Sequence, residues 1–191
     1  MRVVAAMVAL VLGTSTAEAV TFSQTQYFST GGEAFTFSFT GAPANLGGGG
    51  TLLLELKGDY SPSSGTERTV LTFGGVSGSA TFGNGVIDAN SIGGLGLNGF
   101  TTISTAPNDE QFSVEFSLDN ALLDQVVAGG TISATLDNTP QVDRGIGGQG
   151  FNSFAIRYTN GLPQIPLPPT VWLLLGSLGL FGVSRGLAAR R

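Results

Sequence analysis

The chain of 191 residues contains neither cysteine nor histidine, and only 11% of its residues are charged. Without cysteine, it has no disulfide framework and no thiolate metal site. Without histidine, Ser-His-Asp and Cys-His catalysis are excluded, and zinc, copper and haem sites lose their usual ligands. These absences remove many enzyme classes, and we expect a non-catalytic protein without a cofactor.

What charge there is in the central region is mostly negative. Between Val20 and Leu162 there are four cations and twelve anions, a net charge of −8. Such a surface repels phosphate backbones, so no nucleic-acid partner is expected. The acidic balance suits solubility or the binding of cations. A hydrophobic share of 41% is ample for the core of one domain.

The first nineteen residues predict a signal peptide. Arg2 supplies a positive start, Val3 to Leu12 form an apolar run, and Ala17-Glu18-Ala19 is a small-x-small cleavage site. The apolar run of about ten residues is too short to cross a bilayer, which needs about 20. The small residues Ala17 and Ala19 predict that signal peptidase cuts after Ala19. The alternative, a buried core helix, explains neither the charge nor the Ala-x-Ala ending.

The last residues predict a stalk and a membrane anchor. Residues 163–169 hold four prolines, which prevent a helix and favour an extended segment. Residues 170–191 begin with an uncharged apolar run, preceded by Leu167, and end in a basic stop formed by Arg185, Arg190 and Arg191. An apolar span of about 20 residues crosses a bilayer, and positive residues stay inside. The predicted topology is N-outside, C-inside, with a buried soluble helix as the alternative.

A short motif precedes this anchor: Ile165, Pro166, Leu167, Pro168 and Pro169. Together with the hydrophobic helix and basic tail, it resembles the VPLPA-CTERM sorting signal, a relative of the PEP-CTERM signals of Gram-negative bacteria. Pro166, Leu167 and Pro168 match that motif, Ile165 replaces valine conservatively, and Pro169 departs from alanine. The resemblance implies processing by an exosortase, a membrane-embedded enzyme, and a role at the cell surface or in an extracellular polysaccharide matrix. On that interpretation the anchor is transient.

Residues 20–162 show the alternation of strands in antiparallel sheets. Apolar residues recur at every second position in five segments: 35–40, 52–57, 112–118, 132–136 and 154–158. Weaker segments lie at 70–73, 79–82, 86–88 and 100–104. Only residues 120–127 offer a helical turn, with Asp119 as its cap.

Turn residues separate these segments. Asn84-Gly85 and Asn98-Gly99 are typical of hairpins, and Gly47 to Gly50 should join two strands. The segments are short, are separated by turns, and have one solvent-facing and one buried side. They predict an all-β antiparallel sandwich of the jelly-roll kind. We therefore expect this sandwich to be flanked by the signal peptide and a transmembrane helix.

Chemical motifs are scarce within the predicted sandwich. The glycine tract at 47–50 is not followed by the lysine of a phosphate-binding loop. Glu110 and Glu115 could serve as the acid and base of a glycosidase, but carboxylates on a strand edge are ordinarily solvated.

Calcium binding is a more serious possibility than catalysis, because calcium prefers oxygen ligands, which loops of exported β-domains can supply. Asp88 with Asn90 forms one candidate cluster, and Asp137, Asn138 and Asp143 form another. Neither has the spacing of an EF-hand, and Asp and Asn are also common in turns for backbone reasons. The polar, glycine-rich residues 137–149 are a candidate ligand-binding loop at one end of the sandwich.

The sequence thus predicts an exported, non-catalytic surface or matrix protein, whose partners are signal peptidase, an exosortase-like enzyme, the membrane and extracellular polysaccharide. The alternative is a carbohydrate-binding sandwich, with or without calcium. A sugar platform needs exposed aromatic rings, and the only tyrosines are Tyr27, Tyr60 and Tyr158. The exposure of these rings separates the two hypotheses.

Overall fold

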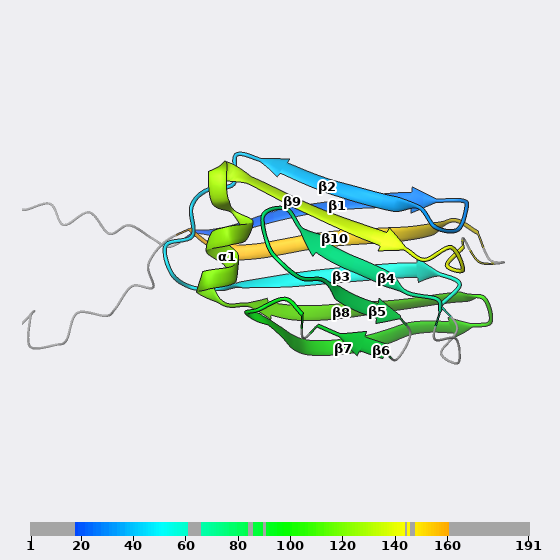
Figure 1. Cartoon of the computed structure of the whole chain (residues 1–191). Coiled ribbons are helices and arrows are strands. Elements are labelled where there is room, and N and C mark those ends of the chain that lie inside the picture. The colour runs from blue at the N-terminus through cyan, green and yellow to red at the C-terminus, as the bar shows by residue number, and fades with distance from the viewer. Residues whose placement is uncertain are drawn as a thin grey trace, which may run out of the picture.

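Two antiparallel sheets face each other in the computed structural model of the chain (Figure 1). The structure describes residues 18–60, 66–83, 86–89, 91–143, 145 and 148–160. Sheet A has the strand order β1-β10-β3-β8-β7 and sheet B the order β2-β9-β4-β5-β6. Every neighbouring pair of strands is antiparallel, which confirms the prediction of an all-β antiparallel sandwich.

The strands differ greatly in length. Those of sheet A are β1 (Ala19–Phe28), β10 (Gly150–Thr159), β3 (Gly50–Gly58), β8 (Asp109–Leu118) and β7 (Leu95–Ala106). Those of sheet B are β2 (Ala34–Thr40), β9 (Thr131–Asn138), β4 (Thr69–Phe73), β5 (Ala80–Gly83) and β6 (Val86–Asp88). From β1 to β4 the chain crosses to the other sheet at every connection.

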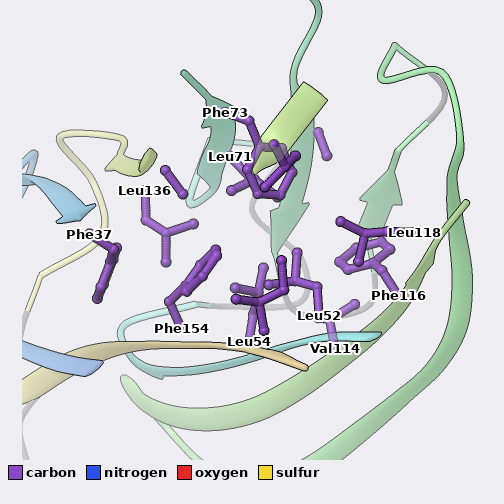
Figure 2. Close-up of a cluster of buried hydrophobic side chains, with 14 of the residues drawn as sticks. Phe37, Leu52, Leu54, Leu71, Phe73, Val114, Phe116, Leu118, Leu136 and Phe154 are labelled. Atoms are coloured by element: carbon purple, nitrogen blue, oxygen red, sulfur yellow. The ribbon is translucent and has the colours of Figure 1, made fainter. Parts of the chain in front are cut away.

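Alternation along the strands builds the core between the sheets. Phe37 of β2 stacks on Phe154 of β10, with ring centroids 5.5 Å apart, and so joins sheet B to sheet A (Figure 2). Leu52 and Leu54 of β3 and Phe116 of β8 are fully buried in the same layer. Strands β3, β8, β9 and β10 each bury one face and leave the other at least partly exposed, as the period of two requires.

All five strongly alternating segments form strands, and the four weaker segments also do so, at least in part. Strand β1 was not predicted. Two glutamines, Gln24 and Gln26, interrupt the side of β1 that turns toward sheet B, between Phe22 and the buried Phe28. Polar residues at an edge position mask the alternation, and only pairing with β10 shows that the segment is a strand.

The prediction of a turn at Asn98-Gly99 was wrong. Both residues lie within β7, where the pairing with β8 shifts between Leu97 and Gly99 and leaves Asn98 as the extra residue of a bulge. A β-bulge accommodates one unpaired residue without reversing the chain, and such bulges are frequent at sheet edges. The other predicted turn separates β5 from β6, which pair antiparallel, but residues 84–85 lie outside the described residues.

A short helix closes one end of the sandwich. Helix α1 (Asn120–Val126), followed by the turn η1 (Ala128–Gly130), begins after Asp119, whose Oδ1 accepts the N–H of Leu122 at 2.8 Å. The predicted cap is thereby confirmed. Leu122, Leu123 and Val126 are buried beneath the helix. Strand β1 begins and β10 ends at this same end of the molecule (Figure 1).

Both predicted terminal segments, most of the signal peptide and the whole of residues 163–191, lie outside the described residues. Within the part of the chain that the structure describes, no helix is long and apolar enough to cross a membrane.

Candidate functional site

The two ends of the sandwich differ in chemistry. We call the end opposite α1 the distal end; it is formed by the loops that follow β1, β3 and β7 and by the loop that precedes β10. At the end that carries α1, aliphatic side chains close the core. At the distal end the core is closed by polar groups, and a hollow lies beside them. The distal end is therefore the candidate site.

The hollow has a volume of about 740 Å³ and an open, polar wall. Its described lining is Ser29, Asp59, Asn108, Asp143, Gly145, Gly148 and Gln149. The backbone N–H of Asp59 donates to the carbonyl of Asp143 at 3.0 Å, which ties two loops together at the wall. Both side chains are acidic, so this wall favours neutral or cationic groups over anions.

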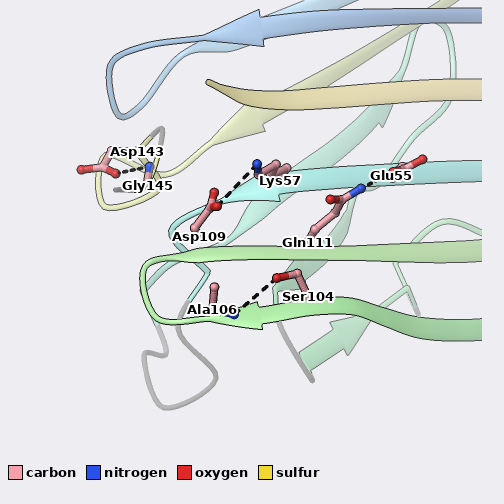
Figure 3. Close-up of polar contacts among 8 residues, drawn as sticks. All are labelled: Glu55, Lys57, Ser104, Ala106, Asp109, Gln111, Asp143 and Gly145. Carbon is pink, nitrogen blue, oxygen red and sulfur yellow. Dashed lines mark hydrogen bonds and ion pairs between the residues drawn. The ribbon is translucent and has the colours of Figure 1, made fainter. Parts of the chain in front are cut away.

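The loop that precedes β10 has a conformation that strongly favours glycine. Gly145 has φ +71°, and a Cβ there would collide with the carbonyl of Asn108. Its N–H donates to Oδ1 of Asp143 at 2.8 Å, which fixes the direction of that carboxylate (Figure 3). The predicted ligand-binding loop, residues 137–149, thus does line the hollow, although residues 144, 146 and 147 lie outside the described residues.

Behind the hollow, a buried polar cluster joins the two sheets. The hydroxyl groups of Tyr60 and Thr69 are 2.8 Å apart, and Thr69 donates to Oδ1 of Asn138 at 2.7 Å. Asn152 of sheet A donates to the same oxygen at 3.0 Å. Burial raises the pKa of Tyr60, and the hydrogen bond with Thr69 opposes that rise. A buried network of this kind rigidifies the loops that it anchors.

One row across the outer face of sheet A reaches the distal end with two aromatic rings, of which Tyr27 is exposed and Phe151 is half-buried. Pairing places Tyr27, Phe151, Lys57, Gln111 and Ser104 side by side on five neighbouring strands. The side chain of Tyr27 is 61% exposed, and its ring meets that of Phe151 edge-on at 6.1 Å. Tyr60 and Tyr158 are buried, so Tyr27 alone among the tyrosines offers its ring to solvent.

Polar side chains continue the row. Lys57 forms an ion pair with Asp109 at 3.4 Å, and Gln111 donates to Glu55 (Figure 3). The pairing satisfies the charge of Lys57 while leaving the side chain partly exposed. An apolar ring beside amide, carboxylate and ammonium groups is the mixture found in small-molecule sites, where apolar contact gives affinity and polar groups fix orientation.

The structure does not bring the calcium candidates together. Asp137 is exposed on the outer face of β9, whereas Asn138 points inward and is 2% exposed, within the polar cluster. Asp88 lies in the same cross-strand row as Asp137 but three strands away, about 14 Å at the usual strand spacing. Asn90 lies outside the described residues, and Asp143 lines the hollow.

The described residues contain no group of three or more carboxylates that could hold a metal ion. Calcium ligands lie about 2.3–2.6 Å from the ion, so the ligands of one site must converge, as the outward Asp137 and inward Asn138 do not. The calcium site stays a prediction; of its candidate residues, Asp143 lines the hollow, together with Asp59.

The two glutamates weighed as an acid and base pair lie on opposite faces of β8. Glu110 is 4% exposed and accepts the backbone N–H of Tyr60 at 3.1 Å, while Glu115 is exposed on the outer face. The expectation that both are solvated was wrong for Glu110. An odd spacing of five residues along a strand reverses the face, so the two carboxylates cannot flank one substrate bond.

Sequence reasoning missed Asp59, Asn108 and the aromatic pair of Tyr27 with Phe151. No motif surrounds them, because they come together only where four separate loops and two strands meet. Comparisons of the chain with known protein families, with curated proteins and with solved structures found no match.

Proposed function

We propose that this is an exported, non-catalytic protein of the cell surface or extracellular matrix, held by its C-terminal sorting signal at least for a time. Residues 1–19 are its signal peptide, residues 163–169 its stalk with the sorting motif, and residues 170–191 its membrane helix and basic tail. If β6 and β7 are treated as additions, the two sheets have the orders β1-β10-β3-β8 and β2-β9-β4-β5. These are two four-stranded sheets in the order of a jelly roll, which supports that class of sandwich.

One strand pairing supports this proposal. Val20, the first residue after the proposed cleavage site, pairs with Tyr158 near the end of β10, and in the uncut chain the N–H of Asn160 also donates to the carbonyl of Glu18 at 3.0 Å. The first residue of the mature domain and the start of the tail therefore lie at the same end of the sandwich. The proposed signal peptide and sorting tail both act at the membrane, so attachment at one end of the domain suits a protein that carries both.

The same geometry orients the candidate site. Strand β10 runs from the distal end to the exit, and its ten residues span about 33 Å. A domain tethered after Asn160 would hold its hollow and Tyr27 away from the bilayer, where extracellular partners are met. Cutting after Ala19 would remove one residue from β1 and leave Val20, paired with Tyr158, as the first residue of the sheet.

A carbohydrate-binding role is the second candidate, and the exposed ring of Tyr27 favours it. Aromatic faces with neighbouring polar groups suit sugars, which combine apolar C–H faces with hydroxyl groups. The acidic wall with Asp59 and Asp143 favours neutral or amino sugars over uronic acids, since like charges repel.

The anchor is tested by truncation. Deleting residues 167–191 and expressing the chain in an exporting Gram-negative host should move the protein from the membrane to the soluble periplasmic or external fraction. A matched control replaces Arg190 and Arg191 by lysine, which keeps the charge and should leave the protein in the membrane. Mass spectrometry of the full chain from a host that has an exosortase would report both cleavages.

Retention of the truncated chain in the membrane would refute the anchor. Release of the full chain with an intact C-terminus would refute sorting while leaving export in place. The two outcomes separate the tail's role from that of the signal peptide.

A further inference from the structure

Strand β7 is a long sheet edge with an unusual composition. It is the longest strand of the described chain, with twelve residues, and it pairs only with β8. Residues 89–107 contain no charged side chain, in a central region whose net charge is −8. Natural sheets normally protect long edges with charges or proline, or by covering them. Within β7 only the two bulges, near Asn98 and Ile103, provide such protection.

The other described sheet edges are short or covered. Strand β6 has three residues and cannot extend over the length of β7. At the opposite side, β1 and β2 lie against each other: Gln26 donates to the carbonyl of Thr36 at 2.9 Å, and the rings of Phe22 and Phe39 are 5.6 Å apart. Among the residues that the structure describes, the sandwich is therefore closed along β1 and β2 and open along β7.

The open edge exposes apolar side chains on both sides of a regular segment. Leu97 and Ile103 are each 51% exposed, and the ladder from Gly99 to Thr102 between them is uninterrupted. The outward backbone groups of such a strand are available to another strand. An edge that combines free backbone groups with flanking apolar side chains is suited to strand addition.

We propose that two copies of the domain associate by antiparallel pairing of their β7 strands. Antiparallel self-pairing has two-fold symmetry and closes the assembly at a dimer, in which the two A sheets join edge to edge. A two-fold axis at Phe100 places Leu97 of one copy opposite Ile103 of the other, on both sides of the axis. The edge is thus complementary to itself.

Charge selects a second copy over other partners. A basic partner would gain from carboxylates at the edge, and β7 has none. A second copy of this domain is itself acidic, so it can associate only through a contact that brings no carboxylates together. The uncharged edge meets that need, while the anions of both copies remain outside the contact.

Engineered cysteines test the pairing in the full-length chain, which has no cysteine of its own. The double variant Leu97→Cys with Ile103→Cys, exported to an oxidising compartment, should give a disulfide-linked dimer on non-reducing gels. Each single variant should give little, because identical positions lie about 20 Å apart in this register. The matched control is Thr21→Cys with Tyr27→Cys, an exposed pair with the same spacing on the opposite edge strand.

The β7 pair should yield about tenfold more dimer than the control, since pairing raises the local thiol concentration. A strong dimer from Thr101→Cys or Thr102→Cys alone would also support pairing through β7, in a shifted register. Equal dimer from the control pair, or none from any β7 variant, would overturn the proposal. The cross-link should persist after deletion of residues 167–191. Failure of the dimer proposal can therefore be distinguished from failure of the anchor proposal.

Discussion

Glu18 and Asn160, far apart in sequence, are joined by a backbone hydrogen bond of 3.0 Å at the exit of the domain. The contact continues the ladder between β1 and β10 by one step and fixes where both terminal segments leave. Because the distal loops lie at the other ends of these two strands, the point where the tail begins and the candidate site are separated by the length of the sheet (Figure 1). The proposed anchor and the proposed binding site therefore belong to opposite ends of the domain.

The proposed signal peptide ends in a small-x-small cleavage site formed by Ala17 and Ala19. Replacing either alanine by phenylalanine should block removal of residues 1–19, because signal peptidase requires small side chains there. Intact-mass measurement of the exported chain should show the uncut N-terminus. The matched control is Val4→Leu, which keeps the run apolar and should leave cleavage unchanged. An unchanged mature N-terminus in the phenylalanine variants would refute the site.

Tyr60 should contribute to stability through its buried hydroxyl. The Tyr60→Phe variant leaves the polar cluster without one partner, and we expect a loss of about 1–3 kcal/mol in the free energy of unfolding. The matched control is Tyr158→Phe, whose part-buried hydroxyl donates to the carbonyl of Pro43 outside the cluster and which should lose less. Urea unfolding of the tail-truncated chain at pH 7 measures both. Equal losses would contradict the special role of the cluster.

The stability of the domain should also fall at alkaline pH because of Tyr60. Burial raises the pKa of this phenol above its ordinary value near 10, so the folded state keeps a proton that the unfolded state has lost. The contribution is complete below pH about 10 and declines above it by about 1.4 kcal/mol per pH unit. Tyr60→Phe should flatten the decline between pH about 10 and pH about 12. An identical pH slope in both proteins would count against this role of Tyr60.

Tyr27 should matter for binding and not for folding. If the distal row binds glycans, Tyr27→Ala should weaken retention on an array of neutral and amino-sugar oligosaccharides by about tenfold, or about 1.4 kcal/mol. The control is Leu46→Ala, which should bind like the unchanged chain. Leu46 is 52% exposed and follows Asn45, whose side chain donates to Asp124 of α1 at the other end of the sandwich. Both variants should unfold within about 0.5 kcal/mol of the unchanged chain. Equal binding by both variants, or none by the unchanged chain, would remove the carbohydrate hypothesis.

Most strands could be predicted from the sequence because alternation is local: a buried face recurs at every second residue whatever the partner strand is. Strand β8 shows this directly, with Phe112, Val114, Phe116 and Leu118 all buried. The helix cap at Asp119 was equally local, since it depends on one side chain and the N–H three residues later. Edge strand β1 lacked the pattern and was missed.

The candidate site could not be predicted in the same way. Asp143 was selected for its loop, but its neighbour Asp59 is distant in sequence and is brought to it by a contact between two loops. Asn138 looked like a metal ligand beside Asp137, yet adjacent residues on a strand face opposite sides. The alternation that predicted the strands also excludes this pair, once β9 is known to continue through Asn138.

The sequence by itself determined the sandwich and its hydrophobic faces, since period and turn residues are properties of short segments. Tertiary structure alone decided that the hollow, the polar cluster and Tyr27 share the end opposite the chain exit, and that β7 is an open edge. The physical reason is that strand order and register are set by contacts between segments distant in sequence. No local pattern records which strand remains without a neighbour.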